Sequence, residues 1–245
     1  MIVGKQKPLE EIWDMVKGYR KILVFGCNTC VAVCHEGGNK EAEILGSLLR
    51  MKAKQDGVDT EIKMKAKQDG VDTEIKTGGI ERQCEHEYFE KAVGDIEGVD
   101  AVLSIACGAG VQFLGEKFPG KTALPGLNTT FIGVVDAPGE FSERCIMCGD
   151  CILHLTGGIC PITRCSKSLM NGPCGGSNKG SCEISPDVPC AWHLIHDRLK
   201  SQGNIGLIQA YIPAKNWTTS RDGGPRKQVR EDMRMEKETV AGQAA

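Results

Sequence analysis

The feature that most constrains this chain is a run of cysteines between residues 145 and 190. Eight of the 13 cysteines fall in this stretch. The packing of a hydrophobic core does not require such a density, so the run must bind metal or form disulfides. The eight cysteines are Cys145, Cys148, Cys151, Cys160, Cys165, Cys174, Cys182 and Cys190.

The spacing of the run distinguishes between kinds of metal. Cys145, Cys148 and Cys151 stand three apart, as at the opening of a bacterial ferredoxin cluster run, and a Cys-Pro pair at 160–161 is typical of the close of such a run. The run departs from the ferredoxin pattern in one respect, because the gap between Cys151 and Cys160 is longer. Zinc sites more often use separated C-x2-C pairs finished by histidine, and His154 is the only histidine inside the run. The run therefore predicts iron–sulfur ligation, with zinc as the alternative and disulfides as a third possibility.

The number of sites stays open at this point. Eight thiolates suffice for two four-iron clusters, for one cluster with spare cysteines, or for one cluster and one zinc ion. Glycines crowd the run. They fit ordinary turns, and they equally fit a backbone that wraps a cluster and points its N–H groups at sulfur.

Composition excludes several classes of partner. The chain has 30 basic and 32 acidic residues, a formal net charge of −2, and no basic stripe interleaved with aromatics, so we expect no nucleic acid partner. The amino terminus lacks the apolar run of a signal peptide, and no apolar stretch approaches the ~18 residues of a membrane helix. We therefore expect a soluble, cytoplasmic protein without membrane insertion. In a reducing compartment, the cysteines favour metal over disulfides.

Short apolar runs alternate with helical patterns before the cysteine run. This alternation predicts right-handed crossovers and a small parallel sheet, that is, an α/β Rossmann-like domain followed by a cysteine-rich iron–sulfur domain. We place the domains at 1–140 and 141–205, with a charged, flexible or partner-docking tail at 206–245. The expected helices cover residues 8–18, a stretch from 39, 85–96, 111–117 and 191–199. The expected strands cover residues 21–25, a region before 81, 100–106 and one or two stretches after 121.

Residues 51–63 recur without change at 64–76. A tandem copy of this length is too short for a solenoid repeat. One copy already completes helix, turn and strand, so the second has no obvious place in the fold. We expect one copy to form a poorly ordered excursion at the surface.

Further cysteines stand where the predicted strands end. Cys27 follows the first strand, with Cys30 and Cys34 close behind, and Cys84 lies just past the second strand region. The carboxyl edge of a parallel sheet is where ligands bind, so these four cysteines are predicted to hold a further four-iron cluster. The alternative is that they pack as small apolar residues. Cys107 follows the third strand and is assigned to that alternative, because four ligands already exist.

A Cys-Gly-Ala-Gly run follows the third strand. Gly108 and Gly110 could cradle a phosphate, for example of a flavin, at a helix start. The run lacks a full G-x-G-x-x-G, so this signal is weak. The sequence contains no convincing acid–base or nucleophile constellation, and we predict no catalytic residues in this chain.

Five motifs carry a family resemblance in order along the chain. They are F-G-C-N-T-C-V-A-V-C at 25–34, E-R-Q-C at 81–84, A-C-G-A-G-V-Q-F-L at 106–114, L-N-T-T-F-I-G at 127–133 and the glycine- and cysteine-rich stretch at 157–176. Together they resemble the MetV family, the iron–sulfur small subunits of acetogen-type methylenetetrahydrofolate reductases. The same region occurs as the carboxyl-terminal domain of some longer reductases. The resemblance spans roughly residues 10–205, and the tandem copy departs from the family pattern.

The resemblance implies a place in a heteromeric oxidoreductase complex. The partner would be a MetF-type TIM-barrel flavoprotein that holds FMN and reduces methylene-tetrahydrofolate to methyl-tetrahydrofolate in the Wood–Ljungdahl pathway. This chain would pass electrons to that flavin through two or three [4Fe-4S] clusters. The electrons would come from heterodisulfide-reductase-like or Rnf-like subunits. The alternative is a zinc-stabilised structural adaptor that joins the flavoprotein to its electron-input subunits. Iron with acid-labile sulfide would favour the first, and zinc alone the second.

Overall fold

The computed structural model describes residues 1–56, 74–230 and 232. Contacts divide the chain into two compact units, Met1–Cys145 and Ile146–Ala245. The domain boundaries predicted at residues 140 and 205 stay predictions.

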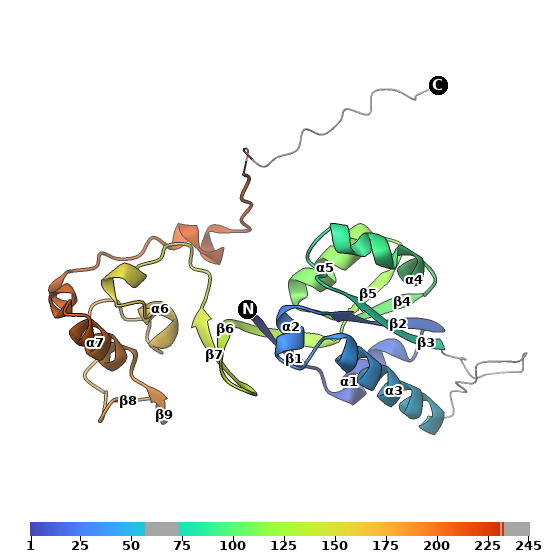
Figure 1. The fold of residues 1–245 in the computed structure, drawn as a ribbon, viewed down its shortest axis with the longest axis horizontal. Helices are drawn as coiled ribbons and strands as arrows, with labels where there is room; N and C mark the ends of the chain where they lie inside the picture. Colours follow the sequence, from blue (N-terminus) through green and yellow to red (C-terminus); the bar gives the residue numbers. More distant parts are fainter. Residues whose placement is uncertain (57–73, 231, 233–245) are drawn as a thin grey trace, which may run out of the picture. The chain divides into compact units, whose positions relative to one another are not determined.

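The first unit is built on a four-stranded parallel sheet in the order β3-β2-β4-β5 (Figure 1). The central strand β2 (Lys21–Cys27) pairs in parallel with β3 (Glu74–Ile80) on one side and with β4 (Ala101–Ile105) on the other. The edge strand β5 (Thr122–Pro125) pairs in parallel with β4. The predicted α/β class with a parallel sheet is therefore confirmed.

Helices cover both faces of this sheet because its strands are apolar on both sides. In β2, Ile22 and Val24 belong to a core shared with α1 and α3, whereas Leu23 and Phe25 belong to a second core on the opposite face. This second core contains side chains of η1, α4 and α5. The helices of the two layers are α1 (Leu9–Val16), α2 (Cys30–Val33), α3 (Asn39–Gln55), η1 (Glu87–Ala92), α4 (Val93–Glu97) and α5 (Gly108–Lys117).

A second, antiparallel sheet in the order β1-β6-β7 was not predicted from the sequence. It consists of β1 (Ile2–Gln6), β6 (Leu127–Ala137) and β7 (Glu140–Cys145). The strand β6 pairs with β1 and β7, and most of its residues are exposed or half-buried. A strand that is exposed to solvent on both faces has little apolar periodicity, so its pairing could not be predicted from the local sequence pattern.

The duplicated segment joins α3 to β3. The first copy begins inside α3, and the last residues of the second copy, Glu74 to Lys76, open β3. Residues 57–73, which make up most of the two copies, lie outside the described residues, and so does the excursion predicted for one copy.

The second unit has little regular structure and a small core. Its main helix α7 (Ala191–Ser201) buries Trp192, Ile195 and Leu199. Half-buried side chains of Ile159, Cys165 and Leu207 pack against this face. The other elements are η2 (Leu153–Leu155), α6 (Pro161–Arg164), β8 (Ser181–Cys182), β9 (Ser185–Pro189), η3 (Ile205–Gln209), η4 (Trp217–Thr219) and η5 (Arg221–Gly223). Within the described part of the chain, no helix has both the length and the apolar character needed to cross a membrane.

Part of the predicted tail binds to this unit. The backbone of Ile212 exchanges two hydrogen bonds with the side-chain amide of Asn171, both of 2.8 Å, and Ile212 itself is buried. Residues 231 and 233–245 lie outside the described part.

Two glycines on α5 give a matched test of the packing in the first unit. A Cβ built on Gly110 would lie 2.9 Å from the Cβ atoms of both Ala106 and Gln83, whereas a Cβ on Gly115 would have only Ala123 as a neighbour, at 3.8 Å. We predict that Gly110→Ala lowers the free energy of unfolding by about 1–3 kcal/mol through overpacking. Gly115→Ala should leave it unchanged or raise it by up to about 1 kcal/mol, through helix propensity. Urea unfolding followed by far-UV circular dichroism measures both, and equal effects would contradict this account.

Candidate metal centres

Three adjacent strands bring cysteines to one edge of the parallel sheet. Cys27 is the last residue of β2 and is buried. Cys84 follows the last residue of β3 by four positions, and Cys107 follows the last residue of β4 by two and caps the start of α5. Because the three strands are parallel neighbours, these cysteines lie at the same carboxyl edge, where open α/β sheets bind ligands.

One buried side chain joins the three segments that carry these cysteines. The amide of Gln83 is fully buried, and its Nε2 donates to the carbonyl oxygens of Phe25 at 2.9 Å and Gly26 at 3.0 Å. Its Oε1 accepts a hydrogen bond of 2.6 Å from the hydroxyl of Ser104 in β4. The loop that presents Cys84 is thus fixed to the ends of β2 and β4. Sequence reasoning gave Gln83 no role, although a polar residue beside a strand-end cysteine was a usable signal.

The thiol of Cys84 lies within electrostatic reach of the other two strand-end thiols. Its pKa is raised above the ordinary value, first by burial and then by the charges of Cys107 and Cys27. Thiolates that raise one another's pKa in this way favour a bound cation, which removes the repulsion. Cys107 therefore lies next to the metal site predicted at this edge.

Cys30 and Cys34 lie on the short helix that follows β2. Cys30 is the first residue of α2 and is half-buried, whereas Cys34 caps the end of that helix and is buried. The Sγ of Cys34 donates to the carbonyl oxygens of Cys30 at 3.3 Å and of Ile2 at 3.6 Å. Burial is the main cause of the raised pKa of this thiol. The thiol of Cys34 is thus buried and directed at the backbone of β1.

The two glycines assigned to a phosphate site have other contacts. The N–H of Gly108 donates to Thr129 Oγ1 at 2.8 Å. Gly110 is buried, and the first turn of α5 lies tightly against Gln83 and Ala106 at this point. One N–H that a phosphate would need is therefore already paired, and the flavin-phosphate assignment stays a prediction.

The first part of the cysteine run forms a loop in the second unit. Cys145, where the run begins, is the last residue of β7 in the first unit. Beyond it, Cys148 is buried, Cys151 is exposed, and Cys160 is half-buried at the start of α6. Gly149 has φ +80°, in the left-handed region that favours glycine, so the loop turns sharply beside Cys148.

Residues from the predicted tail clamp this loop. Thr219 Oγ1 donates to the carbonyl oxygen of Cys148 at 2.8 Å, and Arg226 Nη1 donates to that of Met147 at 3.0 Å. Lys215 Nζ donates to the carbonyl oxygen of Asp150 at 3.0 Å and pairs with its carboxylate at 3.4 Å. Three successive parts of the cysteine loop are therefore held by one segment, a feature that the sequence analysis missed because the pairing is long-range.

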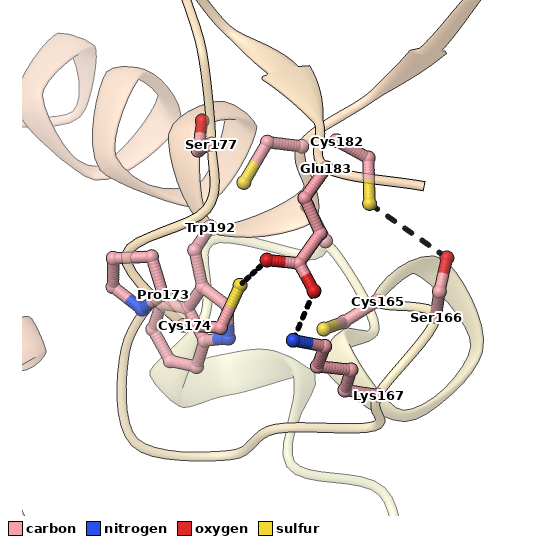
Figure 2. A pocket seen from close by; sticks show the side chains of 11 residues that line it. Cys165, Ser166, Lys167, Pro173, Cys174, Ser177, Cys182, Glu183 and Trp192 are labelled. Atoms are coloured by element: carbon pink, nitrogen blue, oxygen red, sulfur yellow. Dashed lines mark hydrogen bonds and ion pairs between the residues drawn. The ribbon is translucent and has the colours of Figure 1, made fainter. Parts of the chain in front are cut away.

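The second part of the run surrounds one small pocket (Figure 2). Its cavity is about 20 Å³, roughly the space of one water molecule. The cysteines come from different segments: one follows α6, one lies in the next loop, one is in β8 and one caps α7. The four cysteines that line the pocket are Cys165, Cys174, Cys182 and Cys190.

Two of these thiols take part in hydrogen bonds. Burial acts to raise the pKa of Cys190, but the backbone N–H groups of His193 and Trp192 and the hydroxyl of Ser177 outweigh it, so the pKa is lowered. This favours the thiolate, the form that binds metal. Cys174 Sγ donates to Glu183 Oε2 at 3.5 Å, and Figure 2 shows the Glu183 carboxylate between Cys174 and Lys167.

Lys167 and Glu183 form an ion pair beside the pocket. The hydrogen bond between them is the main cause of the raised pKa of Lys167 and of the lowered pKa of Glu183. The Cys174 thiol adds to both shifts. The pair therefore adds a fixed cation and a fixed anion to the wall of the pocket.

The donor chemistry fits a thiolate-bound metal. As the side chains stand, no three Cys, His, Asp or Glu residues in the described part of the chain lie close enough to share one ion. A four-iron cluster is larger than one ion and is held by four cysteine thiolates, the donor type that gathers at the sheet edge and around the pocket. A single zinc ion would need the four pocket thiols to move closer together.

Comparison with known proteins gives one family match. Residues 124–218 match the family model described as methylene-tetrahydrofolate reductase C terminal. Comparison with curated proteins and with solved structures gives no match. The matched segment begins in β5, ends in η4 and contains all eight cysteines of the run. Over this segment, less than half of the chain, the sequence is similar to the methylene-tetrahydrofolate reductase C-terminal family.

Proposed function

We propose that this chain is the electron-transfer subunit of a methylenetetrahydrofolate reductase, relaying electrons through iron–sulfur clusters to the FMN of a MetF-type catalytic subunit. The family match supports the link to that reductase. The observation that carries the electron-transfer part is the gathering of cysteines from separate segments, at the sheet edge and around the pocket. On this proposal the substrate-reducing site belongs to the partner.

The chain's own residues would hold and orient the metal. When bound, an iron–sulfur cluster takes up and releases one electron at a time. The sheet edge would present its thiolates on rigid strand ends, which keeps the site geometry fixed. In the second unit, hydrogen bonds already favour the thiolate of Cys190, and the clamp of Thr219 and Arg226 fixes the backbone beside Cys148.

Two cations of the clamp would favour the reduced state of a cluster bound in the cysteine loop. The side chain of Lys215 is only 4% exposed, and its ammonium lies against Asp150 in the cysteine loop. Arg226 donates to Met147 and also to the carbonyl oxygen of Thr219 at 2.8 Å. Positive charge near a site stabilises the more negative, reduced form, and it does so more strongly where water is excluded.

The adaptor function has one observation in its favour. The pocket lined by Cys165, Cys174, Cys182 and Cys190 is about 20 Å³, which suits one ion better than a four-iron cluster. A closed site of four cysteines is the usual structural zinc site. The second candidate is therefore a chain in which zinc stabilises the second unit and joins the flavoprotein to its electron-input subunits.

Metal content of anaerobically purified protein separates the two candidates. The electron-transfer function predicts about eight to twelve irons per chain with matching acid-labile sulfide, and paramagnetic resonance signals of reduced cubanes after dithionite treatment. About four irons and one zinc per chain would assign the pocket to zinc and still support the electron-transfer function. Zinc without iron would contradict the electron-transfer function and support the structural adaptor.

Cys148→Ala tests the cysteine loop. We predict the loss of one metal site, because a buried thiol beside the clamp is removed. Coupled reduction of methylene-tetrahydrofolate should fall, while flavin chemistry in the partner with an artificial donor should survive. Iron analysis and the two assays measure this, and unchanged metal content with unchanged coupled activity would defeat the assignment.

Lys215→Gln tests the clamp cation. Removing a nearly buried positive charge beside the cysteine loop should make reduction of the site harder, so its midpoint potential should become more negative at unchanged iron content. A dithionite titration followed by paramagnetic resonance reports the potential. Lys200→Gln, at an exposed position on α7, is the matched control and should leave the potential unchanged. Equal midpoint potentials in the wild type, Lys215→Gln and Lys200→Gln would show that Lys215 does not influence the potential of the site.

A further inference from the structure

We infer that Cys107 is a ligand of the sheet-edge metal site, together with Cys27, Cys30 and Cys84, and that Cys34 is not. This inference rests on the proposed function, because it names the ligands of one of its metal sites. It replaces the sequence prediction of Cys27, Cys30, Cys34 and Cys84. Both sets contain four thiols, so the number of ligands does not separate them.

Strand register places Cys107 beside Cys27. Cys27 is paired with Ile80 of β3, and the preceding residue, Gly26, is paired with Ile105 of β4. Cys107 therefore lies one position beyond the level of Cys27 on the neighbouring strand, at the point where the chain leaves the sheet. Two cysteines at almost the same level of adjacent parallel strands face the same edge.

Packing fixes the loop of Cys84 against the segment of Cys107. The buried amide of Gln83 accepts from Ser104, three residues before Cys107. The first turn of α5 then lies so close to Gln83 that a Cβ on Gly110 would be 2.9 Å from the Gln83 Cβ. Gln83, the residue before Cys84, thus contacts the chain on both sides of Cys107: Ser104 before it and the first turn of α5 after it.

Cys34 has a different set of neighbours. Its thiol donates to the carbonyl oxygen of Ile2 in β1 and to that of Cys30, and its side chain is buried. To bind metal it would lose both hydrogen bonds and leave the backbone of β1. Cys30, by contrast, forms a C-x2-C pair with Cys27, is half-buried, and stands at the open start of α2. It is the remaining thiol suited to complete the site.

The experiment compares Cys107→Ala with Cys34→Ala in the full chain, purified anaerobically with the wild type. Iron, zinc and acid-labile sulfide are measured per chain, with paramagnetic resonance of the reduced protein and far-UV circular dichroism as the check on folding. We expect Cys107→Ala to lose about four irons and one cubane signal, and Cys34→Ala to retain the wild-type content.

Cys107→Ser covers the case in which the alanine variant fails to fold. A serine oxygen in place of a ligand sulfur should retain part of the cluster with a shifted resonance spectrum, whereas a serine at a site that binds no metal should leave the spectrum unchanged. Wild-type iron in Cys107→Ala, or an unshifted spectrum in Cys107→Ser, would overturn the inference and leave the proposed function standing.

Failure of the proposed function has a different signature. A wild-type protein without iron and sulfide would end the relay, and the zinc content of the same variants would then decide the ligands. Zinc lost from Cys107→Ala and kept in Cys34→Ala would still support the inference. A wild type without either metal, or zinc lost from Cys34→Ala alone, would overturn it.

Discussion

The fully buried amide of Gln83 is the interaction on which the carboxyl edge of the sheet depends. An amide buried without partners would cost about 1–3 kcal/mol, so the fold must supply its hydrogen bonds. It does so with two carbonyl groups at the end of β2 and one hydroxyl in β4. These partners belong to different segments, so the amide is satisfied only when all are in place. The edge is therefore assembled as a unit, and the amide fixes the backbone near Cys27, Cys84 and Cys107.

The second unit meets a different constraint, because its core is small. Trp192, Ile195 and Leu199 bury one face of α7, and Cys190 is the remaining buried member of that cluster. A core of this size stabilises little, and small scaffolds of this kind commonly gain their stability from bound metal. The four cysteines around the pocket come from separate segments of the unit. Metal bound there would connect these segments directly, which is the physical reason to treat the cysteines as part of the fold as well as of the function.

The local sequence pattern predicted those parts of the fold that depend on local apolar periodicity. The alternation of apolar runs and helices predicted the parallel sheet, since β2 is buried on both faces and α5 follows its strand directly. It failed for β1, whose residues pair with β6 more than a hundred positions away. The same limit applies to the site. The strand-end cysteines could be found from sequence, but the role of Gln83 and the clamp of Thr219 on Cys148 depend on contacts between distant segments.

The two units thus present thiols in physically different ways. At the sheet edge, the positions are fixed by β2, β3 and β4 and by a buried hydrogen-bond network, so removing metal should leave the scaffold intact. In the second unit, loops with left-handed turns carry the cysteines, and a clamp of side chains from a later segment holds one of these loops. A site on a rigid frame keeps its geometry when its charge changes, which suits a centre that must gain and lose electrons without rearranging. A site built from loops gains its order from the metal itself. On the proposed function, the sheet edge would therefore suit electron transfer, and the pocket would suit a structural ion.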